Sequence, residues 1–257
     1  MATNLIIKCN LPLSLVENPA FREFMKECYP KWQPISTKKL KSDIISSFKT
    51  RIHKIICDTL EIVNDLTLTI DAWSHRRGRS FLGITCHFID NKMVPQAFLI
   101  DFVRMKSPHT SDNIQRLTEN VLDRFNIKEK VFRIITDNAS SMIKAYRFGL
   151  AVDGDYQIHD DQCDKSTTDD CSTFDNYDQL EGYLNDPMRS NFSDYWLRSQ
   201  LTSLKKLVAH IFSVQASSAP IERVFSHAGL ILSSRRTRMN EQLFRDIAFL
   251  KANQCLI

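Results

Sequence analysis

The sequence lacks the cysteine pattern of a zinc module or of a disulfide-linked secreted domain. Its seven cysteines are an odd number, and none of them forms a CxxC pair. Some, such as Cys57 and Cys86, lie in apolar runs, which is typical of buried thiols in a reducing compartment. Cys163 and Cys171 lie near His159, but their spacing fits no common zinc site. We therefore interpret these three as loop residues.

The sequence also lacks a run that would take it into or across a membrane. The apolar stretch within residues 1–9 is short, and polar residues follow it. A transmembrane helix needs about 20 consecutive apolar residues, and a signal peptide needs an apolar region before a small-residue cleavage site. We expect neither feature, and no membrane partner.

A strong net charge is absent, but the charges are unevenly distributed. The formal net charge is +4 over 257 residues. Residues 151–195 hold 12 acids and 2 bases, so the remainder of the chain keeps 18 acids and 32 bases, a surplus of 14. A basic body is compatible with nucleic-acid contact. A solvated charged surface is an equally common interpretation of the same numbers.

Residues 1–62 show the apolar spacing of helices, interrupted by prolines. A first helix is expected to begin near Pro19, and Pro30 and Pro34 end that pattern. A longer helix is expected over residues 39–62, where apolar residues recur at spacings of three and four. We predict a helical N-terminal segment over residues 1–62.

The spacing then changes to that of strands. Apolar and β-branched residues fill residues 66–73, 80–89 and 94–105, with turn residues between these runs. Strands joined by short turns pair antiparallel, so these three predict a meander. A capped helix and a fourth strand over residues 131–136 follow, and a helical crossover makes that strand parallel to the first. Residues 63–150 therefore predict an α/β core.

Two aspartates occur at the ends of the strands that we expect to be parallel neighbours. Asp71 is expected to close the first strand, and Asp137 directly follows the fourth. Parallel strands lie about 5 Å apart and end at the same sheet edge, so the two carboxylates would meet there. Such a pair shares a proton or holds Mg²⁺ or Mn²⁺. The alternative is that Asp137 only caps the helix after it.

The last part of the chain divides into an acidic stretch and a helical region. Residues 151–195 are rich in Asp, Ser and Thr and have no apolar period, so we predict a flexible linker. Residues 196–257 regain a helical period, with one apolar face over residues 201–212. Pro220 stands at the first position of a further helix, and residues 243–250 form a last amphipathic one.

Three passages of the sequence form a set. They are residues 69–74 (TIDAWS) with 81–88 (FLGITCHF), residues 109–110 (HT) with 135–142 (ITDNASSM), and residues 217–229 (SSAPIERVFSHAG) with 235–236 (RR). Together they resemble the hAT (hobo/Activator/Tam3) DNA transposases, especially the branch related to BED zinc-finger proteins. The resemblance covers residues 5–148 and 195–254, and its third passage is the most specific.

The resemblance implies an RNase H-like core with a two-metal site of two aspartates and a glutamate. Asp71, Asp137 and Glu222 match these positions, as catalytic residues and as ligands of Mg²⁺ or Mn²⁺. Carboxylates are the hard ligands that such cations need, and two cations would activate a water or 3′-hydroxyl at a DNA phosphate. Glu222 has an alternative explanation, because an acid in the first helical turn is favoured by the helix dipole.

The resemblance also implies a homodimer formed by the C-terminal helices, contact with DNA, and a nuclear location. The dimerisation candidates are Val224, Phe225, Leu230, Leu243, Ile247 and Leu250. The candidates for DNA contact lie in two basic turns and are Arg76, Arg77, Arg79, Arg235, Arg236 and Arg238. A solvated turn explains these arginines about as well.

The sequence departs from the family's pattern in three places. We expect no BED finger before residue 1, nothing like the family's fifth strand follows Tyr146, and the acidic stretch over residues 151–195 stands in place of a large helical insertion. We therefore expect a truncated RNase H-like core with a helical hAT dimerisation region at residues 196–257. The favoured function is dimerisation with some DNA association, catalysis being lost, and no small-molecule substrate. The alternatives are an active magnesium-dependent transposase and a non-sequence-specific DNA-binding protein.

Overall fold

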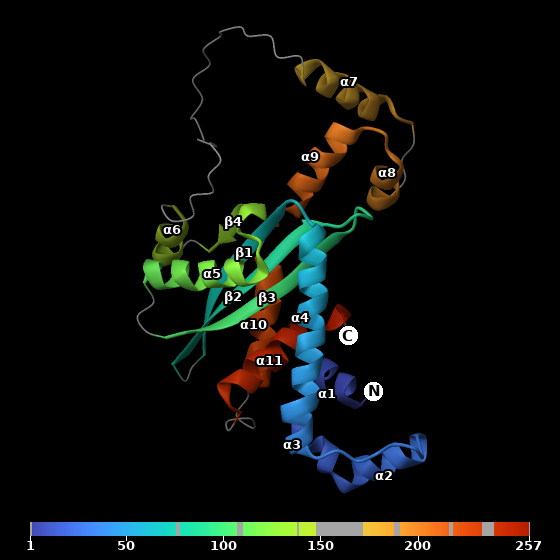
Figure 1. The fold of residues 1–257 in the computed structure, drawn as a ribbon, viewed down its shortest axis with the longest axis vertical. Coiled ribbons are helices and arrows are strands. Elements are labelled where there is room, and N and C mark those ends of the chain that lie inside the picture. Colours follow the sequence, from blue (N-terminus) through green and yellow to red (C-terminus); the bar gives the residue numbers. More distant parts are fainter. Residues whose placement is uncertain are drawn as a thin grey trace.

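A mixed sheet of four strands, in the order β3-β2-β1-β4, forms the centre of the molecule (Figure 1). The computed structural model describes residues 2–75, 78–106, 110–137, 139–147, 172–187, 191–215, 218–232 and 239–256. The strands are β1 (Leu66–His75), β2 (Arg79–Ile89), β3 (Pro95–Met105) and β4 (Val131–Thr136). The antiparallel meander and the parallel fourth strand are therefore confirmed.

The register of β1 corrects one expectation. Asp71 does not close the first strand, because β1 continues to His75 and pairs Asp71 with Gly83 of β2. The pairing of β1 with β4 ends one residue before Asp71, because Thr136, the last residue of β4, lies opposite Ile70. Asp71 and Asp137 therefore follow the last matched pair of the two parallel strands, although only Asp137 stands at a strand end.

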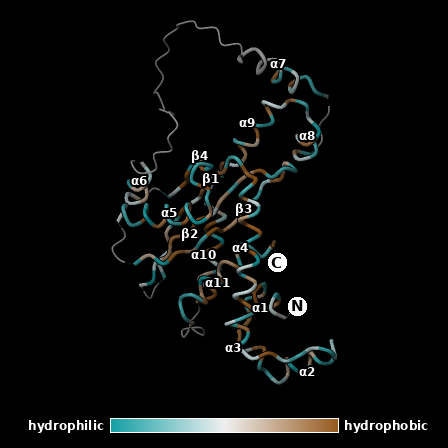
Figure 2. The backbone as a smooth tube through the Cα atoms, in the orientation of Figure 1, coloured by the Kyte–Doolittle hydropathy of each residue, from teal (hydrophilic) through white to brown (hydrophobic). Residues whose placement is uncertain are grey.

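The sheet is buried, and its sequence reflects this. Nearly every residue of β2 is buried, so both faces of the strand are covered and its sequence shows little alternation of apolar and polar residues. Figure 2 shows the hydrophobic residues concentrated along these central strands. Helices α4 (Ile45–Ile62) and α5 (Ser111–Phe125) lie in front of the sheet in Figure 1, and α10 (Ala219–Ile231) and α11 (Glu241–Ala252) lie behind it.

The two edges of the sheet differ. At β3, the fully buried Asn253 side chain accepts a hydrogen bond from the Leu99 N–H (3.0 Å) and donates one to the Leu99 carbonyl (2.9 Å). This amide takes the place of a strand neighbour and closes part of the edge. In the described part of the chain, β4 is the other edge and no fifth strand lies beside it.

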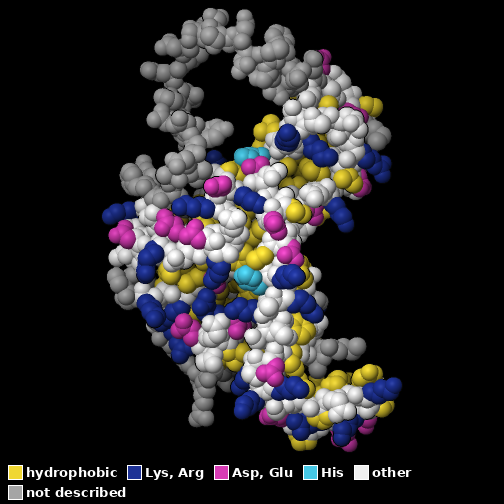
Figure 3. All heavy atoms as spheres, in the orientation of Figure 1, with side chains coloured by type: hydrophobic (Ala, Val, Ile, Leu, Met, Phe, Trp, Pro, Cys, Tyr) yellow, Lys and Arg dark blue, Asp and Glu magenta, His cyan; other side chains and the backbone are white. Residues whose placement is uncertain are grey.

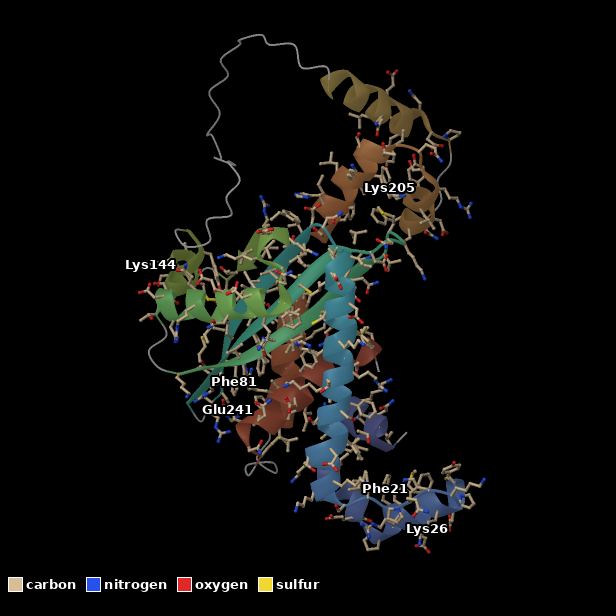
Figure 4. All side chains as sticks on the ribbon, viewed as in Figure 1. Phe21, Lys26, Phe81, Lys144, Lys205 and Glu241 are labelled. Atoms are coloured by element: carbon tan, nitrogen blue, oxygen red, sulfur yellow. The ribbon has the colours of Figure 1, made fainter. Side chains whose placement is uncertain are left out.

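The helices expected before the sheet are present. They are α1 (Ala2–Lys8), a 3-10 turn (Leu13–Glu17), α2 (Pro19–Cys28), α3 (Thr37–Lys39), a π-helical turn (Leu40–Ile44) and α4. The Asn18 side chain caps α2 through the Phe21 N–H (3.3 Å), and Ser36 caps α3 through the Lys39 N–H (3.1 Å). Figure 4 shows Phe21 and Lys26 on α2, at the end of the molecule far from the sheet.

The prediction of a linker over residues 151–195 is wrong in its second part. Helix α7 (Ser172–Asn185) and the first turn of α8 (Phe192–Arg198) occupy it, while residues 148–171 lie outside the described residues. Helix α7 is held by contacts with later residues: the side-chain Oε1 of Gln179 accepts hydrogen bonds from the backbone N–H groups of Ser203 (2.9 Å) and Leu204 (3.1 Å) at the start of α9 (Thr202–Ser213). In the described ranges no helix is long and apolar enough to span a membrane.

Candidate functional site

The charges of Asp137 and Glu222 act on Asp71 at the end of the parallel β1–β4 pair. Burial raises the pKa of Asp71 above its ordinary value, and the negative charges of Asp137 and Glu222 raise it further. A hydrogen bond from the Ala72 N–H acts in the opposite direction. The structure thus brings the three sequence-predicted carboxylates into one electrostatic group, the carboxylate trio.

Helix α10 brings Glu222 to the sheet because Gly83 leaves room for it. A Cβ atom at Gly83 would lie 2.6 Å from Cδ1 of Ile221 and 3.0 Å from Cε1 of Phe225, so the first turns of α10 rest directly on β2. Gly83 is the cross-strand partner of Asp71, and paired residues face the same side of a sheet. Glu222 and Asp71 are therefore held on the same side.

Each member of the carboxylate trio is also engaged within its own segment. Asp71 Oδ1 accepts from the Ala72 N–H (2.7 Å), and Asp137 Oδ1 accepts from the Ala139 N–H (3.4 Å) before α6 (Ser140–Arg147). The Ser218 hydroxyl donates to Glu222 Oε1. Asp137 thus forms a turn contact just before α6, and Glu222 lies in the first turn of α10, where the helix dipole favours an acid.

As it stands, the carboxylate trio does not fit a two-metal site. Across the described residues, no three His, Cys, Asp or Glu side chains gather closely enough to hold a metal ion. The charges of Asp137 and Glu222 act on Asp71 from a distance, without the shared oxygen cage that Mg²⁺ or Mn²⁺ requires. A role of these residues as metal ligands stays a prediction from the resemblance.

Beside the carboxylate trio, Trp73 belongs to an aromatic cluster between the sheet and the C-terminal helices. Its ring lies nearly parallel to that of Phe225 on α10, with centroids 6.3 Å apart and an angle of 13° between the planes. It also contacts the rings of Phe81, Phe102 and Phe244. The cluster fixes α10 and α11 on this face of the sheet.

Most of the predicted dimerisation residues lie in the core of the chain itself. Val224, Phe225, Leu243, Ile247 and Leu250 are all at least nine-tenths buried. Leu230 differs, since 61% of its side chain surface is exposed. In this fold the apolar faces of α10 and α11 therefore pack on the chain's own sheet, and five of the six candidates are not at a surface that a partner could contact.

Two family models match the chain in the order in which its domains occur. Residues 69–153 match the ZBED1 RNase-like domain, and residues 186–253 match the hAT family C-terminal dimerisation region. The chain therefore combines an RNase-like segment with a hAT dimerisation segment. The four-stranded sheet corresponds to the first match, and helices α8 to α11 lie within the second.

Similar proteins are named as BED zinc-finger proteins or as transposases. The chain is 22% identical over 146 residues to "Zinc finger BED domain-containing protein RICESLEEPER 2" of Oryza sativa, covering 57% of this chain and 20% of that protein. It is 24% identical over 136 residues to "Putative AC transposase" of Zea mays, covering 53% and 17%. The Arabidopsis thaliana protein DAYSLEEPER is 20% identical over 137 residues, covering 53% and 20%. The chain thus spans about a fifth of the length of these relatives.

Within the hAT dimerisation region, α9 carries apolar side chains that the rest of the chain leaves open. Leu207, Ile211 and Phe212, here called the α9 apolar surface, are 52%, 54% and 52% exposed. The neighbouring helices α8 and α7 also carry exposed apolar side chains, Leu197 on α8 and Leu180 and Leu184 on α7. Figure 3 shows hydrophobic side chains gathered around these helices.

Sequence reasoning found this face as a helix stripe but did not single it out as an interaction surface. The signal was present, because apolar residues on α9 occupy more of the helix circumference than one buried stripe needs.

Of the predicted DNA-contact residues, Arg79 begins β2 opposite His75 and is partly exposed. The other five, Arg76, Arg77, Arg235, Arg236 and Arg238, lie outside the described residues.

Proposed function

We propose that this hAT-derived chain acts by pairing with a second copy of itself through the α9 apolar surface. The observation that carries the proposal is the exposure of Leu207, Ile211 and Phe212 inside a hAT dimerisation match. Burying a Leu, Ile or Phe side chain contributes about 1.5–3 kcal/mol, so an exposed group of them is a strong reason to associate. Contiguous exposed apolar patches of this kind mark interaction sites.

A second copy suits this surface better than an unrelated partner. Leu207 and Ile211 are four residues apart on α9, so they form a stripe along one side of the helix. A stripe of this kind is self-complementary across a two-fold axis, where each residue meets its counterpart or its neighbour. The matched family model is itself a dimerisation region.

The proposed role includes DNA association in the nucleus, without DNA cleavage. Outside residues 151–195 the chain has a surplus of 14 bases, which favours non-specific attraction to phosphates. The carboxylates of the trio already accept hydrogen bonds from the Ala72 and Ala139 N–H groups and from the Ser218 hydroxyl, which suits a local structural role. The names of the relatives associate this family with transposases and BED zinc-finger proteins.

Size measurement on the full chain tests the self-association. Light scattering coupled to size exclusion, run over a series of concentrations, is expected to give a mass near twice 29.8 kDa at high concentration and a lower mass on dilution. A mass that stays at one chain at every concentration would falsify the proposed function.

An active magnesium-dependent transposase is the competing function, and the electrostatic grouping of the carboxylate trio favours it. It is tested with supercoiled DNA and Mn²⁺, comparing the wild-type chain with Asp71→Ala and with Asp65→Ala, an exposed aspartate just before β1. We expect no nicking that depends on Asp71. Nicking that Asp71→Ala abolishes and Asp65→Ala leaves intact would establish the competing function instead.

A further inference from the structure

A cavity of about 200 Å³ lies between the β2–β3 pair and helices α10 and α11. None of its lining residues belongs to the carboxylate trio. Its polar lining comes from Thr85 of β2, from Arg223 and His227 of α10, and from Lys251 and Gln254 at the end of the chain. Glu222 and Arg223 are consecutive and therefore point about 100° apart on the helix, one toward Asp71 and the other toward this cavity.

The lining of this cavity is positively charged without compensation. No Asp or Glu is among its lining residues. Within the part of the chain that the structure describes, the ion pairs involve neither Arg223, His227 nor Lys251. The cavity therefore presents a guanidinium, an ammonium and an imidazole to whatever enters it.

Lys251 is the most informative of these groups because it is 6% exposed. Its Nζ donates to the carbonyl oxygen of Lys8, at the end of α1. An ammonium group has three N–H donors and no acceptor, so two donors remain. A buried ammonium without a countercharge costs several kcal/mol, and a bound anion would supply that charge.

The remaining polar groups supply neutral donors. Burial lowers the pKa of His227, and the charge of Lys251 lowers it further, so the ring is neutral at pH 7 and donates one N–H. The Gln254 amide adds N–H donors at the rim. The buried Thr85 hydroxyl donates to the Thr69 carbonyl (3.2 Å) and lies 3.0 Å from His87 Nε2, so it is held in place at the wall.

We propose that this cavity binds a phosphoryl group. A planar guanidinium beside an ammonium matches the several oxygens of a phosphate, and such charge-assisted hydrogen bonds are about twice as strong as neutral ones. The volume of about 200 Å³ is below the range of roughly 300–1,000 Å³ typical of sites for whole small molecules. It suits one small anionic group, which is either free phosphate or a phosphate of a nucleic-acid backbone.

The experiment titrates inorganic phosphate into the full chain by calorimetry, at constant ionic strength set with chloride. The variants are Arg223→Gln, whose side chain is exposed and not required for packing, and Lys144→Gln as the control on α6. Figure 4 shows Lys144 on α6, away from α10 and α11. We expect saturable binding by the wild-type chain, a loss of about tenfold or more with Arg223→Gln, and a change within about twofold for the control.

Lys251→Met gives a second, independent readout. It removes the buried ammonium, so its thermal unfolding is compared with and without phosphate, and the phosphate-dependent rise in Tm is expected to disappear. If the variant does not fold, the Arg223→Gln titration still decides the matter. No saturable phosphate binding by the wild-type chain, or equal weakening by Arg223→Gln and Lys144→Gln, overturns the proposal.

A third arm identifies the source of the phosphoryl group. If it belongs to DNA, free phosphate competes with a short duplex and Arg223→Gln weakens duplex binding more than Lys144→Gln does. If it is a free phosphate, duplex binding is unaffected by either change. Both results support a phosphoryl site, and neither depends on whether the chain pairs with a second copy.

Discussion

Helix α9 and the helix pair α10–α11 lie in the same hAT dimerisation match, yet they use their apolar residues differently. Val224, Ile247 and Leu250 of the pair are buried against the chain's own sheet. Leu207 and Ile211 of α9 are more than half exposed. Apolar periodicity in a sequence therefore identifies a helix face, but not whether the same chain or another copy covers it.

The contacts of the two parts with the sheet explain the difference. Helices α10 and α11 meet the sheet through the aromatic cluster, in which Phe81 and Phe102 stack with centroids 4.9 Å apart and Phe244 meets Phe81 edge-on at 5.1 Å. Helix α9 reaches the sheet only near its end, where His210 stacks on Phe132 at 3.6 Å and Ser213 lies 3.4 Å from Thr67. The rest of α9 therefore extends beyond the sheet (Figure 1).

The largest effect is expected from truncating the aromatic cluster. Phe244→Ala removes a fully buried ring and leaves a cavity among aromatic neighbours, so it should lower the free energy of unfolding by about 3–5 kcal/mol. Leu207→Ala on α9 is the matched truncation at the surface, and it should change the free energy of unfolding by less than about 0.5 kcal/mol. Urea unfolding of dilute protein measures both, and similar losses for the two variants would contradict the comparison.

The next effect concerns Asp101 of β3, which joins α5 and α11 to the sheet. Burial alone would raise its pKa, but Arg124 and Arg245 hold the pKa below its usual value, with Arg245 Nη2 3.1 Å from Asp101 Oδ1. Asp101→Asn should cost about 2 kcal/mol, less than a fully buried pair because Arg124 is 48% exposed.

The pH dependence of this variant checks the cause. A carboxyl whose folded pKa is depressed stabilises the fold above its unfolded pKa of about 3.9. That contribution is lost as the pH falls through the lower folded pKa of Asp101. The difference in stability between wild type and Asp101→Asn should therefore be largest at neutral pH and shrink below about pH 4. A difference that grows on acidification would refute this account.

Replacing two glycines by alanine should change the stability by smaller amounts and in opposite directions. Gly83→Ala places a Cβ 2.6 Å from the flexible end of Ile221, so it should destabilise the chain by about 1 kcal/mol or slightly more. Gly182→Ala in α7 meets Leu201 at an ordinary 3.5 Å and should stabilise that helix by about 0.5–1 kcal/mol. Thermal unfolding measures both effects. A Gly83→Ala variant with unchanged stability would show that α10 does not rest on β2.

The smallest effect is expected at Asp71. Its folded pKa is raised, so the charged form opposes folding, and stability is lost as the pH rises through that pKa. Asp71→Asn should therefore stabilise the chain at pH 7, by less than about 1 kcal/mol after solvent screening. Adding Mg²⁺ should not make the wild type more stable than Asp71→Asn. Stabilisation of the wild type alone by millimolar Mg²⁺ would instead indicate a working metal site.

Local signals in the sequence predicted the strands and most helix starts. Thr110 caps α5 through the Asn113 N–H at 3.4 Å, as the capping pattern indicates, and Asn18 does the same for α2. The parallel pairing of β1 and β4 followed from the crossover rule and placed Asp71 beside Asp137. These features depend on residues close together in sequence or on general rules of connection.

Features set by distant residues were not predictable in the same way. Helix α7 lies in an acidic stretch without apolar period, and it is held by the Gln179 side chain at the start of α9. The continuation of β1 beyond Asp71 is set by pairing with β2, which has more residues than β4. The basic cavity around Lys251 brings together residues of β2, α10 and α11, and no sequence spacing marks that meeting.

The central claim is that α9, and not α10, carries the contact with a second copy. Sedimentation equilibrium on full-length wild type, Ile211→Lys and Leu230→Lys tests it, since both side chains are more than half exposed and both charges are tolerated in a monomer. We expect Ile211→Lys to raise the dimer Kd by about tenfold or more and Leu230→Lys to leave it nearly unchanged. A Kd that rises with Leu230→Lys and not with Ile211→Lys would contradict the account.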